Sequence, residues 1–321
     1  MSAGPAIVFV GVHREAVDPF RFLIEAGENV AGLVTLTERA MRRVSAAVDL
    51  TGMAEAAGIP CLRVKNVNQP ESIDWIRQRA PDLLLVVGWT QLVREELLDV
   101  PRLACLGFHA SLLPRYRGRA PVNWALIHGE RETGNTMIVL APGADEGDIV
   151  SQRRIPITDE DDCGTLYDKV AATEVEMLAE VLPAIRDGQM PRIEQDDREA
   201  SVMPRRRPED GVVDWAQPAR KIFNWVRALT HPYPGAFTSS ARGRVLIWKV
   251  EESGEPDGGS ALPGAVRHDD RGWPLVACAS GWVRVLRAQL DGCDELDGVG
   301  AGRDYLRAGT RLGPATEGDG T

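Results

Sequence analysis

The sequence lacks the features of a secreted or membrane-spanning protein. No window reaches the run of about 18 apolar residues that a membrane helix needs. The five cysteines, at positions 61, 105, 163, 278 and 293, are odd in number and include no C-x-x-C pair, which argues against a disulfide framework. The amino terminus has no charged segment followed by an apolar core and a cleavage site. We therefore expect reduced thiols, no membrane partner and a cytoplasmic location.

Several motifs that bind cofactors, metals or acyl groups are also absent. No G-x-G-x-x-G or Walker sequence occurs, so a dinucleotide cofactor is not indicated. No H-E-x-x-H or paired cysteine spacing occurs, and we expect no metal. The sequence has no G-x-S-x-G elbow, which disfavours a serine nucleophile.

The composition is that of an ordinary globular protein, with 44% hydrophobic and 26% charged residues. At 321 residues the chain is long enough for two domains. The formal net charge of -10 argues against a broad nucleic-acid-binding surface, because neutralising phosphates requires clustered Lys and Arg.

Apolar runs alternate with helical patterns in the first part of the chain. AIVFVGV at 6–12, NVAGLVTL at 29–36 and PDLLLVV at 81–87 predict buried parallel strands. Their order predicts an α/β fold with a Rossmann-like, doubly wound parallel sheet. The later runs VLIWKV, LVACA and WVRVLRAQL, separated by glycine-rich turns, predict a small OB-like β-barrel. We expect a catalytic domain at 1–190, a linker at 191–208, the β domain at 209–308 and a flexible tail at 309–321.

A histidine and an aspartate follow two predicted strands near the middle of the chain. LACLGF at 103–108 predicts a short buried strand, and His109 follows it at the edge where open α/β sheets place their ligands. Asp145 lies in the turn PGADEG, after the apolar run 137–140. We expect both side chains on exposed loops at neighbouring strand ends.

These residues resemble the folate-dependent formyltransferase family. Its members carry an Asn-x-His pair, then SLLPxxRG, and later an aspartate in a G-x-D-x-G turn. This chain has Gly107-Phe108-His109, SLLPRYRG from Ser111 to Gly118, and Asp145 between two glycines. The stretch EDGVVDWAQPARKIFNWVRALTHPYPGAFT at 209–238 resembles the family's carboxyl-terminal domain and extends the resemblance over most of the chain.

The resemblance implies an enzyme that moves a formyl group from 10-formyltetrahydrofolate to an amine. Such a transfer passes through a tetrahedral oxyanion and needs a proton taken from the amine. Histidine titrates near neutral pH and can donate to the oxyanion, while a nearby carboxylate favours its charged form. The catalytic residues that the resemblance implies are therefore His109 and Asp145, and Asp145 can also receive the proton of the amine.

The resemblance also implies two sets of binding residues. The folate-contacting residues would be Val87, Gly88, Trp89, Thr90, Gln91, Leu92, Leu112, Ala144 and Asp145. The acceptor-contacting residues would be His13, Ser111, Arg117, Gly118 and Asn123. The alternatives are a core position for Trp89, loop-shaping roles for Ser111 and Arg117, and no role for His13.

Two groups of arginines are candidates for phosphate contacts. Arg39, Arg42 and Arg43 lie on a predicted loop after the second strand, and Arg205, Arg206 and Arg207 lie in the predicted linker. The alternative for both groups is a solvated charged segment.

Gly107 departs from the family pattern. The family asparagine donates its amide to the formyl oxygen, and losing one such donor costs about 10²- to 10³-fold in rate. Asn123 or a bound water can take its place. The same departure also fits a folate-binding relative with little transfer activity, or one that gives the formyl group to water.

The acceptor is predicted from charge and from local resemblance. GRAPVNWALIHGE at 118–130 and HPYPGAF at 231–237 resemble the sugar-modifying branch of the family. Together with the acidic net charge, they predict a small-molecule amine, a nucleotide-linked amino sugar, as substrate and partner. Methionyl-tRNA, disfavoured by the charge, and an N-hydroxyornithine-type amino acid are the alternatives. We expect a monomer or homodimer.

Overall fold

The computed structural model describes residues 4–254 and 261–313. The described residues form two compact units that interleave along the chain. Unit 1 comprises residues up to 121, 132–157 and 165–205, and unit 2 comprises 122–131, 158–164 and the residues from 206 onward. Within the described ranges, no helix has the length and apolar character needed to cross a membrane.

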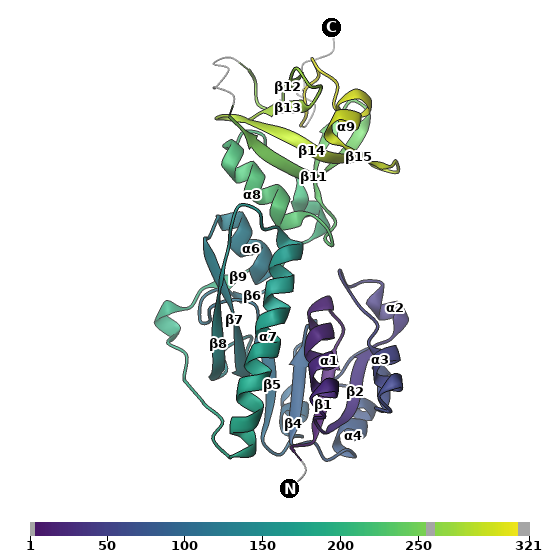
Figure 1. Cartoon of the computed structure of the whole chain (residues 1–321), viewed down its shortest axis with the longest axis vertical. Helices are drawn as coiled ribbons and strands as arrows, with labels where there is room; N and C mark the ends of the chain where they lie inside the picture. Colours follow the sequence, from purple (N-terminus) through teal and green to yellow (C-terminus); the bar gives the residue numbers. More distant parts are fainter. Residues whose placement is uncertain (1–3, 255–260, 314–321) are drawn as a thin grey trace. The chain divides into compact units, whose positions relative to one another are not determined.

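Unit 1 is built on a seven-stranded sheet in the order β3-β2-β1-β4-β5-β7-β8 (Figure 1). The strands are β1 (Ile7–Gly11), β2 (Val30–Leu36), β3 (Cys61–Val64), β4 (Leu83–Val87), β5 (Ala104–His109), β7 (Glu132–Val139) and β8 (Ile149–Pro156). The first five are parallel, which confirms the predicted Rossmann-like α/β fold. β7 and β8 are antiparallel to their neighbours, so the sheet is mixed rather than wholly parallel. The connection between β7 and β8 is too short for a crossover that would make these two strands parallel.

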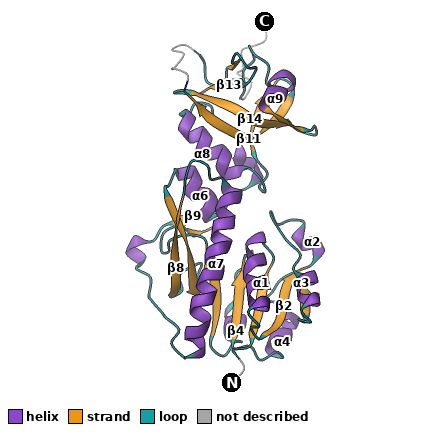
Figure 2. Ribbon diagram, in the orientation of Figure 1, coloured by secondary structure: helices purple, strands orange, loops and turns teal. Residues whose placement is uncertain are grey.

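Helices cover both faces of this sheet, as Figure 2 shows. They are α1 (Val17–Glu25), α2 (Glu38–Met41), α3 (Thr51–Ala56), α4 (Pro70–Arg77), α5 (Glu95–Leu98) and α7 (Cys163–Arg186), with the 3-10 turns η1 (Arg14–Ala16) and η2 (Asp197–Glu199). Phe9, Phe20 and Leu178 belong to the apolar core on the face of α1 and α7. Val8, Ile73 and Cys105 belong to the core on the other face. Burial on both faces explains why the parallel strands are continuously apolar.

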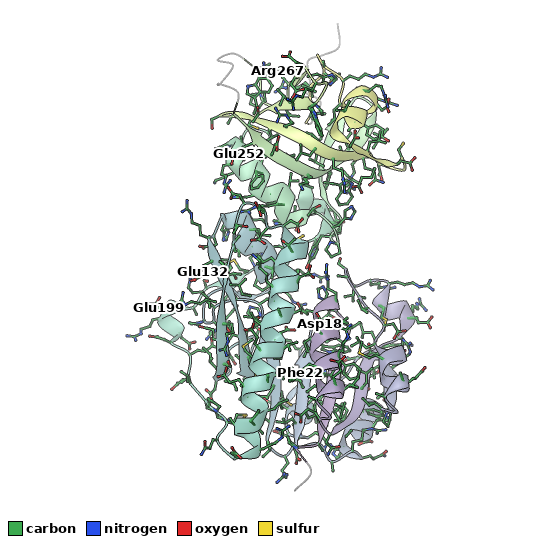
Figure 3. All side chains as sticks on the ribbon, in the orientation of Figure 1. Asp18, Phe22, Glu132, Glu199, Glu252 and Arg267 are labelled. Atoms are coloured by element: carbon green, nitrogen blue, oxygen red, sulfur yellow. The ribbon has the colours of Figure 1, made fainter. Side chains whose placement is uncertain are left out.

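The segment after α7, predicted as a polar linker, contains a short strand. β6 (Arg117–Gly118) pairs in parallel with β9 (Val202–Met203). Figure 3 labels Glu199 in the 3-10 turn that precedes β9. The segment therefore returns to the loop that follows His109.

Unit 2 contains a six-stranded antiparallel sheet, which confirms a second, β-rich domain. Its elements are η3 (Pro208–Gly211), α8 (Ala219–Leu229), β10 (Ala236–Ser240), β11 (Gly243–Ser253), β12 (Val266–His268), β13 (Pro274–Ala277), β14 (Trp282–Leu290), β15 (Glu295–Asp297) and α9 (Gly298–Asp304), with α6 (Pro121–His128) supplied from earlier in the chain. The three apolar runs noted in the sequence form β11, β13 and β14. β10, β12 and β15 are short and partly polar, so alternation did not reveal them.

The carboxyl-terminal residues of the described chain are paired. Leu312 donates its backbone N–H to Gly264 and Val266 donates to Thr310. The remainder of the predicted flexible tail, residues 314–321, lies outside the described residues.

Candidate active site

His109 is the last residue of β5 and is buried, with a relative exposure of 7%. The prediction that it lies on an exposed loop is wrong. Its Nε2 lies 2.7 Å from the carbonyl oxygen of Tyr116. A carbonyl only accepts hydrogen bonds, so Nε2 carries a proton and donates it there. Nδ1 is therefore the ring nitrogen that remains for chemistry.

Asp145 faces that nitrogen from the turn between β7 and β8. Its Oδ1 lies 3.4 Å from Nδ1 of His109, and its Oδ2 accepts the backbone N–H of Gly118 at 2.9 Å. The residue has a φ of 59°, a left-handed conformation that aspartate tolerates better than most residues. The carboxylate is thus held by one oxygen and points the other toward the histidine.

The two residues meet although their strands run in opposite directions. β5 pairs with β7 so that Val139, the last residue of β7, lies opposite Leu106. Leu106 is three residues before His109. The carboxyl end of β7 therefore lies at the opposite edge of the sheet from His109, and the turn after β7 must fold back. The prediction of neighbouring strand ends assumed parallel strands and was wrong on this point.

A buried glutamine, Gln195, ties this turn to the loop after β5. Its Nε2 donates to the carbonyl oxygens of Asp145 at 2.9 Å and Gly147 at 2.7 Å. Its Oε1 accepts from Nη2 of Arg117 at 2.8 Å, and Arg117 also pairs with Asp197. Sequence reasoning missed Gln195 because it lies 50 residues beyond Asp145 in a segment with no motif.

The loop of SLLPRYRG is organised by its own hydrogen bonds. Ser111 Oγ donates to the carbonyl oxygen of Arg115 at 2.7 Å. The hydroxyl of Thr136 on β7 donates to the carbonyl of Ser111, also at 2.7 Å. Gly118 lies in β6 with a φ of 101° and donates to Asp145. Ser111 and Arg117 are buried, and their polar groups face the protein itself.

Gly107 lies in β5 on the same face as His109, and its missing side chain has not left a vacancy. A Cβ added there would lie 2.6 Å from Cδ2 and 3.2 Å from Cγ of Leu140. Leu140 packs against the apolar core that includes Cys105 and Val86. Its backbone N–H donates to the carbonyl of Cys105 at 2.8 Å, which fixes its position. Leu140 therefore occupies the space where the family asparagine would extend.

The loop after β4 contains most of the expected folate contacts. Gly88 has a φ of 55°, and a Cβ there would lie 2.6 Å from Cβ of His13. Trp89 packs against the core, yet its indole Nε1 is buried without a hydrogen-bond partner in the described structure. Gln91 bonds through its side chain to the loop after β3, which leaves its backbone for a ligand. Leu92 is 60% exposed.

Next to this loop lies an open hollow of about 840 Å³ within unit 1. Its lining includes Gln91, Leu92 and Pro142, and Pro142 lies three residues before Asp145. Lys65, Arg94 and Arg119 line the rest of it. The hollow is thus bordered by both segments that the resemblance assigns to folate.

A group of buried polar residues lies near the start of η1. Nδ1 of His13 is 3.7 Å from Oε2 of Glu15. Glu174 on α7 is almost fully buried beside Asn135, and burial, reinforced by the negative charge of Glu15, raises the pKa of its carboxyl well above the usual range. His13 is therefore half-buried beside the Glu15 carboxylate rather than exposed.

Asn123 on α6 belongs to unit 2, where it is buried. Its Nδ2 donates to the carbonyl oxygen of Ala228 at 2.6 Å. This amide is already used inside unit 2, so it is not the free donor that would replace the family asparagine.

The two arginine groups differ in their surroundings. Arg39 lies on α2, so the predicted loop is partly helical, and Arg39, Arg42 and Arg43 are exposed without an ion pair among the described residues. Arg206 lies between the rings of Trp124 and Trp225, at 5.1 and 4.5 Å from their centroids. The solvated-linker alternative therefore does not hold for Arg206.

The described part of the chain contains no group of three or more His, Cys, Asp or Glu side chains able to hold a metal ion.

Comparison with known families agrees with this geometry. Residues 23–182 match the model of the formyl transferase family, and residues 206–303 match the model of the formyl transferase carboxyl-terminal domain. The chain belongs to the formyltransferase family. It is therefore a formyl-transferring enzyme, as the resemblance implied.

Curated formyltransferases resemble the chain over nearly its whole length. A methionyl-tRNA formyltransferase of Geobacter sulfurreducens is 38% identical over 316 residues, which are 98% of this chain and 98% of the relative. One from Citrifermentans bemidjiense is 38% identical over 313 residues, 97% of this chain and 95% of the relative.

Two solved structures share the fold. HypX of Aquifex aeolicus, in complex with tetrahydrofolic acid, superposes with a TM-score of 0.64 at 21% identity over 95% of this chain. The chain spans about half of HypX, 48% of its length. The sugar 3N-formyltransferase WlaRD, with dTDP and 5-N-formyl-THF, gives 0.66 at 17% identity and covers 90% of this chain and 98% of WlaRD.

These findings overturn the predicted acceptor and partner. The relatives at 36–38% identity are named methionyl-tRNA formyltransferases, whereas the sugar-modifying enzyme shares only the fold. The predictions of a nucleotide-linked amino sugar as acceptor and of a nucleotide-sugar as partner are therefore wrong. The net charge is unevenly distributed along the chain: residues 206–321 contain 15 Lys and Arg against 16 Asp and Glu, while residues 1–205 contain 22 against 31.

Proposed function

We propose that this formyltransferase moves the formyl group of 10-formyltetrahydrofolate to the α-amino group of methionyl-tRNA. The observation that carries the proposal is the near full-length similarity to methionyl-tRNA formyltransferases. The facing pair His109 and Asp145 supports it, since these side chains have the chemistry that amine formylation needs.

His109 and Asp145 divide the proton chemistry between them. Nδ1 of His109, when protonated, donates to the formyl oxygen as that oxygen gains negative charge. Asp145 Oδ1 accepts the proton that the amine loses when its nitrogen bonds to the formyl carbon. That proton then passes to the folate nitrogen whose bond to the formyl carbon breaks. The bonds from Nε2 to Tyr116 and from Gly118 to Oδ2 hold both groups in place.

The donor supplies the formyl group, and the chain supplies its binding surface. The backbone of Gln91 and Leu92 suits the amide-bearing edge of a pterin, because backbone groups at a strand end offer both donors and acceptors. Pro142 and Ala144 belong to the turn after β7, and the hollow that Gln91, Leu92 and Pro142 line gives the donor room. The folate-bound relatives HypX and WlaRD, which share the fold, are consistent with this assignment.

The acceptor RNA requires cations that are free to meet phosphates. Arg39, Arg42 and Arg43 are exposed without ion pairs among the described residues, which suits them to this contact. The antiparallel domain, whose expected OB-like form suits oligonucleotides, provides a further exposed cation, Arg244. We assign the enzyme to the cytoplasm, where its acceptor is made.

The test is an acceptor panel with the full chain and 10-formyltetrahydrofolate. We expect formylmethionyl-tRNA to form, and the KM for methionyl-tRNA to rise with salt, since phosphate contacts release counterions. A dTDP-linked amino sugar serves as the comparison acceptor. Turnover of the sugar without turnover of methionyl-tRNA would contradict the proposal.

A further inference from the structure

The loop after β4 is held at several points by different segments of unit 1. At its far end, the side chain of Gln91 bonds to the loop after β3. In its middle, Nη1 of Arg119 donates to the carbonyl of Thr90 at 3.2 Å. At its near end, Gly88 leaves the strand with a φ of 55° and accepts the backbone N–H of His13 at 3.2 Å. The direction in which the loop leaves the sheet is therefore set beside His13.

Two side chains fill the space next to Gly88. A Cβ at Gly88 would lie 2.6 Å from Cβ of His13, 3.0 Å from Cγ of Glu15 and 3.1 Å from Oε1 of Glu15. Both side chains are mostly buried, with exposures of 12% and 16%. Because protein interiors are close-packed, shortening Glu15 would leave a void directly beside Gly88. The side chain of Glu15 therefore limits how far Gly88 can move toward η1.

The segment that carries these side chains is fixed on two further sides. Arg14 donates its backbone N–H to the carbonyl of Ala46 at 2.9 Å. The guanidinium of Arg14 pairs with Asp168 on α7, and the ring centroid of His13 lies 5.2 Å from that of Tyr167 on the same helix. The segment is thus held independently of the loop after β4, so it can act as a support for that loop.

The surroundings of Glu15 are polar. Four buried polar atoms here have no hydrogen-bond partner within the described residues: Nδ1 of His13, Oε2 of Glu15, Oδ1 of Asn135 and Oε2 of Glu174. Burial, followed by the negative charge of Glu15, raises the pKa of the Glu174 carboxyl, and a protonated Glu174 places no second charge near Glu15. An apolar side chain would fill the space beside Gly88 without leaving polar atoms unpaired. The polar side chain of Glu15 therefore indicates a task other than core packing.

We propose that His13 and Glu15 are positioning residues that hold the loop after β4 in the conformation that binds the folate donor. The inference rests on the proposed function, because it takes Gln91 and Leu92 to contact the pterin. It assigns His13 to the donor side, where the resemblance implied an acceptor contact. A loop whose binding-competent conformation is only partly populated binds its ligand more weakly in proportion to that fraction. Removing either side chain therefore weakens donor binding and leaves the reaction of the bound donor unchanged.

The first test measures donor binding and turnover of the full chain carrying Glu15→Ala. We expect the Kd and KM for the donor to rise about tenfold, with kcat at saturating donor and the KM for methionyl-tRNA unchanged. Glu15→Gln keeps the volume beside Gly88 and should retain the wild-type values. Glu25→Ala changes an exposed glutamate at the end of α1 and is the matched control. An equal rise in donor Kd for Glu15→Ala and Glu25→Ala would overturn the inference, because the effect would not depend on the contact with Gly88.

The second test separates a donor role of His13 from an acceptor role. Tryptophan fluorescence quenching by 5-formyltetrahydrofolate gives the donor-site Kd without any acceptor, and His13→Ala should raise this Kd. A raised KM for methionyl-tRNA with an unchanged donor-site Kd would assign His13 to the acceptor and overturn the inference.

The two variants are independent, so if urea unfolding shows that one has lost its fold, the other remains the test. A wild-type Kd in the folded variants would overturn the inference whatever the acceptor is. A raised Kd in both variants, together with a wild-type enzyme that does not formylate methionyl-tRNA, would refute the proposed acceptor and leave the positioning role supported.

Discussion

The two ring nitrogens of His109 have different tasks, which allows them to be separated by substitution. Glutamine places an amide nitrogen where Nε2 lies and can keep the bond to Tyr116, but it has no equivalent of Nδ1. We expect His109→Gln to lower kcat by about 10²- to 10³-fold with little change in melting temperature.

His109→Ala is the informative comparison for that variant. It removes both nitrogens and with them the hydrogen bond to the Tyr116 carbonyl, so it should also lose about 1–3 kcal/mol of unfolding free energy. Single-turnover formylation and thermal unfolding measure the two effects. Near wild-type turnover in His109→Gln would show that Nδ1 takes no part in the reaction.

The position of Leu140 determines how a substitution at Gly107 should affect stability and activity. Restoring the family asparagine alone places its Cβ 2.6 Å from Leu140, and such overpacking costs about 1–3 kcal/mol. We expect Gly107→Asn to be less stable and no more active than wild type. The paired variant Gly107→Asn/Leu140→Ala makes room for the amide and should raise the formylation rate by about tenfold or more.

Leu140→Ala alone is the control for that pair, since it opens a cavity without adding a donor. It should lose stability and gain no activity. The formylation rates of Leu140→Ala and of the paired variant are measured in single-turnover assays at saturating donor. If Gly107→Asn alone were faster than wild type, Leu140 would not be what fills the site.

Glu174 has a buried carboxyl group whose pKa is raised. The direction in which this group changes the free energy of unfolding with pH can therefore be predicted. Below the ordinary value of 4.5 both the folded and unfolded states are protonated, so the group has no effect. Above it the unfolded chain ionises while the folded chain keeps its proton, and stability falls by up to about 1.4 kcal/mol per pH unit until the folded pKa is reached. Glu174→Gln should therefore be more stable than wild type, increasingly so as pH rises.

Urea unfolding between pH 4.5 and about pH 8 measures that difference. Glu176→Gln, two residues along α7 and exposed, is the matched control and should show no pH-dependent gain. A constant offset for Glu174→Gln across this range would mean that its carboxyl ionises normally in the folded protein.

Elements were predictable from the sequence wherever one pattern dominated. The runs of β1, β2 and β4 are apolar on both faces, which indicates buried parallel strands, and the motif around His109 indicated the candidate site. The direction of β7 was not predictable, because an apolar run does not encode it. Gln195 and Leu140 were missed for a different reason: each acts through a partner that only the folded chain brings near.

The loop after β5 and the turn after β7 depend on one another through Gln195. Leucine has a similar size and removes all of these hydrogen bonds, so the carbonyls of Asp145 and Gly147 lose this donor and Arg117 keeps only its pairing with Asp197 among the described side-chain bonds. We expect Gln195→Leu to lower kcat about tenfold, since Asp145 loses its orientation, and to lose about 1–3 kcal/mol.

The variant Gln195→Glu separates the hydrogen bond with Arg117 from the hydrogen bonds to the turn after β7. A glutamate can still accept from Arg117 but cannot donate to the carbonyls of Asp145 and Gly147. We expect it to recover part of the stability and none of the kcat in steady-state assays. Full recovery of kcat would show that Arg117, not the Asp145 turn, is what Gln195 positions.

At the scale of the whole molecule, the two units do not correspond to two continuous stretches of chain. Unit 2 takes residues 122–131 and 158–164 from within the span of unit 1. Asn123 donates to the carbonyl of Ala228, and Nη1 of Arg227 donates to the carbonyls of Thr158 and Asp161. The predicted boundary at residue 209 separates these partners, since sequence reasoning cuts a chain at linkers and cannot see interleaving.

A fragment of residues 206–321 therefore lacks part of its own core. Arg227 is buried, and without residues 158–161 its guanidinium loses the carbonyls that accept its hydrogen bonds, as α8 loses the amide of Asn123. We expect this fragment to unfold with a broad, weakly cooperative transition, whereas the full chain unfolds cooperatively. Circular dichroism during urea titration measures the difference. A sharp transition in the fragment would show that α8 and the antiparallel sheet fold without the segments that unit 2 takes from earlier in the chain.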